Sequence, residues 1–259
     1  MKVVLFCGGF GMRLREGTES TPKPMVHIGY RPILWHIMKY YAHYGHQDFI
    51  LCLGYKADQI KHYFLRYDET ISNDFVMANG GKDVQLLASD IQDWRITFVD
   101  TGLTSNIGQR LKRVQPFVQD EEIFLANYSD GLTDMDLNEH IAFFKRSNAI
   151  ASFVAVRPNS SFHVVSVCKD GLVESIQDVG KTSMRINGGF FIFRPEIFEY
   201  IGEGEELVFE PFQRLIRLGK LIAYEYDGFW ACMDTFKEKQ QLEDMYSRGQ
   251  LAWKVWEKV

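Results

Sequence analysis

Cysteine is scarce in this sequence, and long hydrophobic runs are absent. The 259 residues include 4 Cys, which lie far apart and form no Cys-x-x-Cys pair, so a disulfide framework is not expected. No window approaches the roughly 20 continuous apolar residues that a membrane span requires. The apolar run after Lys2 ends at Gly8, too soon for a signal peptide. These absences predict a cytoplasmic protein with reduced thiols and no membrane partner.

Positive charge is also in short supply. The chain has 29 Lys and Arg against 34 Asp and Glu, a formal net charge of −5, which argues against nucleic acid as a partner and requires any basic site to be local. Hydrophobic residues make up 46% of the chain, as in ordinary globular proteins. A chain of this length buries about 70 to 75% of its unfolded surface, so it folds without disulfides or a structural metal.

Short apolar runs alternate with helical patterns over the first half of the chain. This alternation is typical of a parallel sheet covered by helices on both faces. The apolar runs predict strands at 3–7, 48–55, 95–102, 123–131 and 150–158. The patterns between them predict helices at 33–45, 57–67 and 136–148.

The pattern changes after Phe162. Apolar runs at 163–167 and 172–176 are separated by a Lys-Asp-Gly turn with no room for a helix, which predicts a hairpin and antiparallel pairing added to the parallel sheet. Further strands are expected at 188–194 and 221–228, and further helices at 209–219 and 236–249. The fold class expected is α/β, a doubly wound, mostly parallel, Rossmann-like sheet with an added antiparallel β segment, all in one domain over 1–259.

A glycine-rich loop, GGFGMRLREGTESTPKPM, follows the first strand at 8–25. A dinucleotide fingerprint would need Gly at position 14, where Leu14 stands, and a Walker loop would need Gly-Lys at 13 and 14. What remains is a glycine turn with cations at Arg13 and Lys23, which can meet the phosphates of a nucleotide through backbone N–H groups and charge. The alternative is a surface loop with incidental basic residues.

This loop resembles the signature of the sugar-1-phosphate nucleotidylyltransferases: GG-x-G-x-RL, then Thr, PKPM and a helix opened by proline. The likeness is closer to the glucose-1-phosphate cytidylyltransferase branch. It extends, in order, over segments at 23–39, 48–56, 99–102, 110–114, 186–191, 228–235 and 252–257. The resemblance implies the nucleotide-diphospho-sugar transferase type of fold, with a nucleotide-binding half at 1–158. The rest, 159–259, would hold the acceptor-binding β segment, one of two metal-binding aspartates (Asp234) and the C-terminal helices.

The resemblance also implies roles for individual residues. Arg13 and Lys23 would be the catalytic cations on the phosphates, and Asp130 and Asp234 would hold Mg²⁺, which prefers oxygen ligands shared with phosphates. The nucleotide-binding residues would be Gly8, Gly9, Gly11, Arg13, Lys23, Thr101, Gly102, Arg110 and Asp130. The acceptor-binding residues would be His163, Lys181 and Asn187.

The implied reaction transfers CMP from CTP to a phosphorylated acceptor and releases pyrophosphate. A phosphate monoester loses its second proton near pH 6, so the attacking oxygen is already an anion at neutral pH and needs no general base. The obstacle is repulsion between two anions, which fixed cations overcome. For this reason none of the seven His is assigned a catalytic role.

Several positions depart from the family pattern, mostly on the acceptor side. Met12 replaces the usual Thr, His163 replaces a Gly, Gln109 replaces a Gly, and Asp178-Val179-Gly180 replaces Glu-Lys-Pro, whose Lys meets the acceptor phosphate. Lys181, Arg185 and His163 are candidates to supply that charge. Glucose 1-phosphate is the first choice of acceptor. The alternative is a different phosphorylated compound, either another sugar or a smaller acyl or alkyl phosphate. A catalytically silent nucleotide-binding homologue is a third possibility.

Two further questions stay open in the sequence. Cytidine rather than uridine rests on the resemblance alone. A homo-oligomer is expected, with the apolar C-terminal end (251–259) as a subunit contact, although Trp253 and Trp256 could instead cover the chain's own core.

Overall fold

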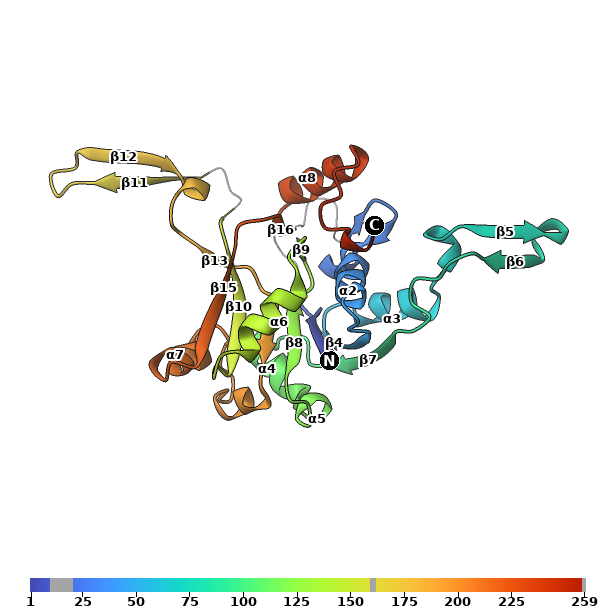
Figure 1. Ribbon diagram of the computed structural model, residues 1–259, viewed down its shortest axis with the longest axis horizontal. Coiled ribbons are helices and arrows are strands. Elements are labelled where there is room, and N and C mark those ends of the chain that lie inside the picture. Colours follow the sequence, from blue (N-terminus) through green and yellow to red (C-terminus); the bar gives the residue numbers. More distant parts are fainter. Residues whose placement is uncertain (10–20, 159–161, 258–259) are drawn as a thin grey trace.

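The main sheet begins with a parallel half. The computed structural model describes residues 1–9, 21–158 and 162–257, and Figure 1 shows a central sheet from which two hairpins project. The parallel strands lie in the order β8 (Phe124–Tyr128), β1 (Lys2–Phe6), β4 (Asp48–Leu53) and β7 (Arg95–Asp100). The first three are buried apolar runs, as parallel strands covered on both faces must be.

The other half of the sheet is mixed. β14 (Phe191–Phe193) lies antiparallel between β8 and β10 (Ala151–Val156). β13 (Ile186–Asn187) pairs antiparallel with β10, and β15 (Leu221–Tyr226) pairs parallel with it. The expected mostly parallel sheet with an antiparallel addition is therefore confirmed, and its antiparallel members are β13 and β14.

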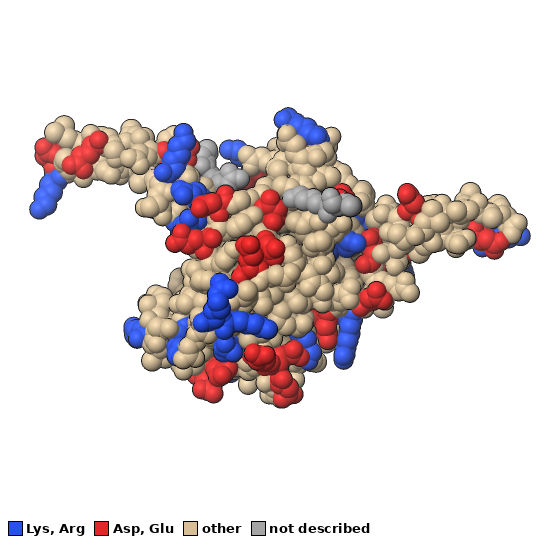
Figure 2. Space-filling view, viewed as in Figure 1, with Lys and Arg blue, Asp and Glu red and all other residues tan. Residues whose placement is uncertain are grey.

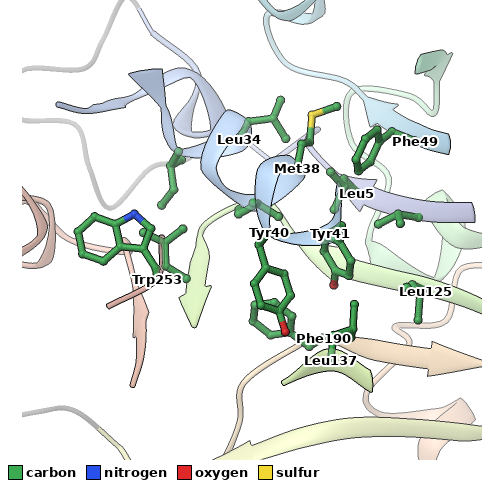
Figure 3. Close-up of a cluster of buried hydrophobic side chains, with 14 of the residues drawn as sticks. Leu5, Leu34, Met38, Tyr40, Tyr41, Phe49, Leu125, Leu137, Phe190 and Trp253 are labelled. Carbon is green, nitrogen blue, oxygen red and sulfur yellow. The ribbon is translucent and has the colours of Figure 1, made fainter. Parts of the chain in front are cut away.

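Helices cover both faces of this sheet. Along β1, Val3 and Leu5 point into one hydrophobic cluster, and Val4 and Phe6 point into another, because successive side chains of a strand alternate. The first cluster packs under α2 (Ile33–His43), α3 (Ala57–Leu65), α6 (Leu137–Lys145) and α8 (Phe236–Ser247). The second packs under α4 (Ile107–Arg113), α5 (Gln115–Val118) and α7 (Glu210–Arg217). Figure 3 shows Leu34, Met38 and Tyr41 of α2 in the first cluster.

Two hairpins project from opposite sides of the body (Figure 1). The first arm is β5 (Phe75–Ala78) with β6 (Asp83–Leu86), and the second arm is β11 (His163–Val167) with β12 (Val173–Asp178). The second hairpin was expected. The expectation that it pairs with the parallel sheet is wrong, because each arm is a two-stranded sheet of its own. The first arm was not predicted, although Asn79-Gly80-Gly81 between apolar runs is a hairpin signal.

The C-terminal segment folds back over the body of the chain. Trp253 is 1% exposed and stacks on Phe229. Lys254 is also buried, over the rings of Tyr30 and Tyr246. The expectation that this end is a subunit contact is therefore wrong for Trp253, which covers the chain's own core. Within the described ranges, no helix is both long and apolar enough to cross a membrane.

Candidate active site

Asp130 and Asp234 are brought together by a small antiparallel sheet. Asp130 comes directly before β9 (Gly131–Thr133). Asp234 is the second residue after β16 (Trp230–Cys232). The two strands pair antiparallel with Cys232 opposite Gly131, and the N–H of Met233 donates to the carbonyl of Asp130 at 3.0 Å. Antiparallel pairing places the start of one strand beside the end of the other. The expected convergence of these distant carboxylates is confirmed.

Lys23 lies between the two carboxylates. Its Nζ donates to a carboxylate oxygen of Asp130 and to one of Asp234. The residue begins a short 3-10 helix, η2 (Lys23–Met25), in which Pro24 and Met25 are buried, so the backbone that carries the ammonium group is fixed. Lys23, which was expected on the phosphates, therefore lies beside the two aspartates that were expected to hold Mg²⁺.

The electrostatics of this cluster reflect its burial. Burial lowers the pKa of Lys23, but the charges and hydrogen bonds of both carboxylates outweigh this, and the pKa lies above its ordinary value. Burial raises the pKa of Asp130, and the charge of Lys23 opposes this without cancelling it. Lys23 thus stabilises the charges of both carboxylates, whereas burial and the charge of Asp234 disfavour the ionised form of Asp130.

The aspartate pair fits a magnesium ion that is shared with phosphates. Mg²⁺ is usually bound through one or two carboxylates together with water and substrate phosphates, and the place between Asp130 and Asp234 already accommodates a positive group. Among the described residues no group of three or more His, Cys, Asp or Glu could hold a metal. The remaining ligands would therefore come from the nucleotide and from water.

Arg110 forms a second buried cationic feature. It is 2% exposed, and its guanidinium donates to the carbonyls of Gly8 (3.0 Å) and Gly102 (3.0 Å) and to Oγ1 of Thr101 (2.7 Å). A Cβ on Gly8 would lie 2.0 Å from Nη1 of Arg110, so glycine is required there for this close approach. Thr101 and Gly102, expected at the nucleotide, are found holding Arg110.

One cavity of about 430 Å³ connects these features. The sequence-predicted residues that line it are Gly8, Gly9, Lys23, Arg110, Asp130 and Asp234. The cavity also includes residues that sequence reasoning missed, namely Ser105, Asn106, Tyr128 and Glu206. Tyr128 could have been found from its place two residues before Asp130. Glu206 carries no such signal, because a loop far along the chain brings it to the cavity.

The predicted acceptor residues do not line the cavity. Nδ2 of Asn187 donates a hydrogen bond of 3.4 Å to the hydroxyl of Tyr128, which lines the cavity. His163 and Lys181 are exposed at the base of the second arm and do not line the cavity. Gly11 and Arg13 lie outside the described residues.

The segment that replaces Glu-Lys-Pro is engaged with its own loop. Asp178 accepts a hydrogen bond from the N–H of Gly180 at 2.8 Å, and Val179 is buried. Arg185, the other candidate cation, forms ion pairs with Glu225 and Asp227. None of these side chains lines the cavity.

Comparison with known proteins gives the family. The model of the nucleotidyl transferase family matches residues 2–231. Glucose-1-phosphate cytidylyltransferases of Salmonella typhimurium and Salmonella typhi are each 42% identical over 260 residues, which covers 99% of this chain and 100% of each relative. A solved structure of UDP-glucose pyrophosphorylase complexed with UDP-glucose has a TM-score of 0.69 at 14% identity, covers 96% of this chain and 98% of its own, and shows the same fold. The chain therefore belongs to the nucleotidyl transferase family, is an enzyme of that class, and is similar along its whole length to glucose-1-phosphate cytidylyltransferases.

Proposed function

We propose that this protein is a cytidylyltransferase that joins CMP from CTP to glucose 1-phosphate and releases pyrophosphate. The identity of the substrates rests on the full-length likeness to enzymes of that name. The observation that carries the chemistry is the meeting of Asp130, Asp234 and Lys23 in one cavity with the glycines that follow β1. Such a place suits a bound triphosphate, because glycine backbone and fixed cations both favour phosphate oxygens.

The reaction needs orientation and charge more than proton transfer. A phosphate oxygen of the acceptor, already ionised at neutral pH, forms a bond to the α-phosphorus of CTP, and the bond from that phosphorus to the β-phosphate oxygen breaks. The electron pair leaves with pyrophosphate. Lys23 would neutralise charge on the phosphates, and the buried Arg110 would hold the Gly8 backbone where the nucleotide lies.

Magnesium is part of this proposal. Asp130 and Asp234 would hold it, and it would supply charge neutralisation for the triphosphate. Two observations support this. The cluster offers two carboxylates, which is a usual number for Mg²⁺, and a positive group already lies between them. All four cysteines, Cys7, Cys52, Cys168 and Cys232, are unpaired thiols, which supports a cytoplasmic enzyme.

A second acceptor is favoured by one observation. The segment at 178–180 that replaces the family's Glu-Lys-Pro is bonded within its own loop and does not reach the cavity. A smaller phosphorylated compound that does not need the missing lysine would suit such a site. Glucose 1-phosphate remains the first candidate because the relatives that share this chain's full length are named for it.

The test is pyrophosphate release from CTP with Mg²⁺, measured with glucose 1-phosphate and with a panel of other sugar phosphates and small acyl and alkyl phosphates. Turnover with glucose 1-phosphate supports the first candidate, and turnover only with a smaller compound supports the second. Binding of CTP without pyrophosphate release at any acceptor contradicts both. UTP, ATP and GTP serve as matched nucleotide controls.

We also propose that the enzyme is a homo-oligomer and that the two arms carry the subunit contacts. The first arm exposes Val76, Met77 and Val84, and the second exposes Val167, Val173 and Ile176. In Figure 2 both arms are largely free of charge along their length, with acidic and basic residues gathered near their ends. A two-stranded ribbon is marginally stable in water by itself, so burial of these side chains against another copy would stabilise it.

A further inference from the structure

We propose that Glu206 determines base specificity by accepting a hydrogen bond from the 4-amino group of cytosine. The residue belongs to the loop before α7, and no motif of the sequence indicates it. It lines the same cavity as Lys23, Asp130 and Asp234. The inference rests on the function proposed above, since it assumes a cytidine nucleotide in that cavity.

The carboxylate of Glu206 contacts the beginning of α4, whereas the aspartate cluster lies at β9 and β16. The neighbours of Glu206 in the lining are Asn106 and Ile107, at the beginning of α4. Tyr128 lines the same cavity and is near both carboxylates: burial raises its pKa, and the charges of Glu206 and Asp130 raise it further. If the phosphates lie at the aspartates, the nucleoside is left to the part of the cavity that Glu206 lines.

The backbone fixes the orientation of this carboxylate. The N–H of Leu207 donates to Oε1 at 3.0 Å, and the N–H of Ile107 approaches Oε2 at 3.4 Å. The loop is pressed against α4, because a Cβ on Gly108 would lie 2.3 Å from the carbonyl oxygen of Glu205. A carboxylate has about four lone-pair sites, so acceptor capacity remains for a ligand in the cavity.

A carboxylate in this place has a narrow choice of ligand groups. It repels phosphates, and when ionised it can only accept hydrogen bonds. Its ligand partner must therefore be a donor. Cytosine presents an amino group at position 4, whereas uracil presents a carbonyl oxygen there. Two acceptors that face each other without water leave both unpaired, and a site built for an N–H group rejects an analogue that lacks it.

The test compares nucleotide affinities by calorimetry in the presence of Mg²⁺. The ligands are CTP, UTP and the 2-pyrimidinone ribonucleoside triphosphate, which carries hydrogen in place of the 4-amino group. The unchanged enzyme is expected to prefer CTP over both by about tenfold or more. In Glu206→Gln the preference for CTP over UTP is expected to fall about tenfold, because the amide can donate to the uracil oxygen.

The control is Glu203→Gln, an exposed change of the same chemistry in the same loop, which should keep the preference. Equal loss of affinity for CTP and UTP in Glu206→Gln would overturn the inference in favour of a ribose contact. Equal binding of CTP and the pyrimidinone analogue by the unchanged enzyme would overturn it without any variant, should Glu206→Gln fail to fold. Binding of neither CTP nor UTP would overturn the proposed function as well, whereas a CTP preference that survives Glu206→Gln would overturn this inference alone.

Discussion

Asp130 and Asp234 share one hydrogen-bond donor, the Nζ of Lys23. The pairing of β9 with β16 fixes the backbones of both aspartates, and η2 brings the lysine to them. Strand pairing and η2 thus bring the three side chains together. Because the three side chains interact through charge, replacing any one of them should change the behaviour of the other two.

The first prediction concerns the two carboxylates. Asp130→Asn and Asp234→Asn are each expected to lower the rate of pyrophosphate release by about a hundredfold or more, since each removes a charge that fixes cations at the reacting phosphates. The measurement is turnover with CTP, Mg²⁺ and glucose 1-phosphate. Asp120→Asn, an exposed change of the same kind, should leave the rate unchanged. Undiminished turnover in the double variant would remove the proposed mechanism.

The second prediction concerns Lys23. Lys23→Met is expected to abolish most turnover and, at the same time, to increase the affinity for Mg²⁺ alone. The ammonium group pairs with both carboxylates, so its removal takes away a positive charge that competes with Mg²⁺ for them. Calorimetric titration of nucleotide-free protein with Mg²⁺ gives the affinity. Weaker binding of Mg²⁺ in the variant would show that the aspartates do not form the metal site.

The third prediction concerns the glycines after β1. Gly8→Ala is expected to lower the free energy of unfolding by about 1 to 3 kcal/mol, because the added methyl group would overlap the Arg110 guanidinium. Gly9→Ala is the matched control, since no described atom lies within 4 Å of its Cβ position. It should change stability by less than about 0.5 kcal/mol. Urea unfolding measures both, and equal stabilities would show that Arg110 is not held as described.

The fourth prediction concerns pH. Burial lowers the pKa of His36 and of His140 to about 3, and their buried Nδ1 atoms have no hydrogen-bond partner in the described part of the chain. The unfolded chain, with His pKa near 6.5, therefore binds more protons than the folded chain between about pH 6.5 and pH 3. Stability is present above this window and is lost as pH falls through it, by about 2 kcal/mol for each His at pH 5.

Urea unfolding at pH 7.5 and at pH 5 tests this pH dependence. His140→Gln should reduce the difference in unfolding free energy between the two pH values. His62→Gln, at an exposed position of α3, is the control and should keep it. An unchanged difference in His140→Gln would mean that His140 does not contribute to acid unfolding.

The fifth prediction concerns assembly. Met77 and Val84 face each other across the first arm and are 63% and 51% exposed. Replacing both by Lys is expected to lower the native mass measured by light scattering, because charges at a buried contact are costly. Replacing the exposed Gln119 and Gln240 of the body by Lys adds the same charge away from the arms and should not. A mass of 30.1 kDa for the unchanged protein would contradict the oligomer itself.

The sequence alone determined many of the strands and helices of this enzyme, and its family. Buried parallel strands are short apolar runs, and amphipathic helices repeat every 3.6 residues, so both are local patterns that a sequence displays. β1, β4, α2 and α6 were predicted for this reason. Asp130 and Asp234 were chosen by resemblance to the family, and their meeting could be expected because a shared metal requires it.

Only the tertiary structure decided the partners of those elements. Strand pairing joins residues far apart in the chain, and no local pattern records it, so β14 between β8 and β10, and the separate sheet of the second arm, could not be predicted. The same holds for Glu206, which reaches the cavity only because its loop packs on Gly108. In the sequence, Trp253 is only an apolar residue near the C-terminal end. Whether it packs on the core of its own chain or on another copy depends on where the chain turns back.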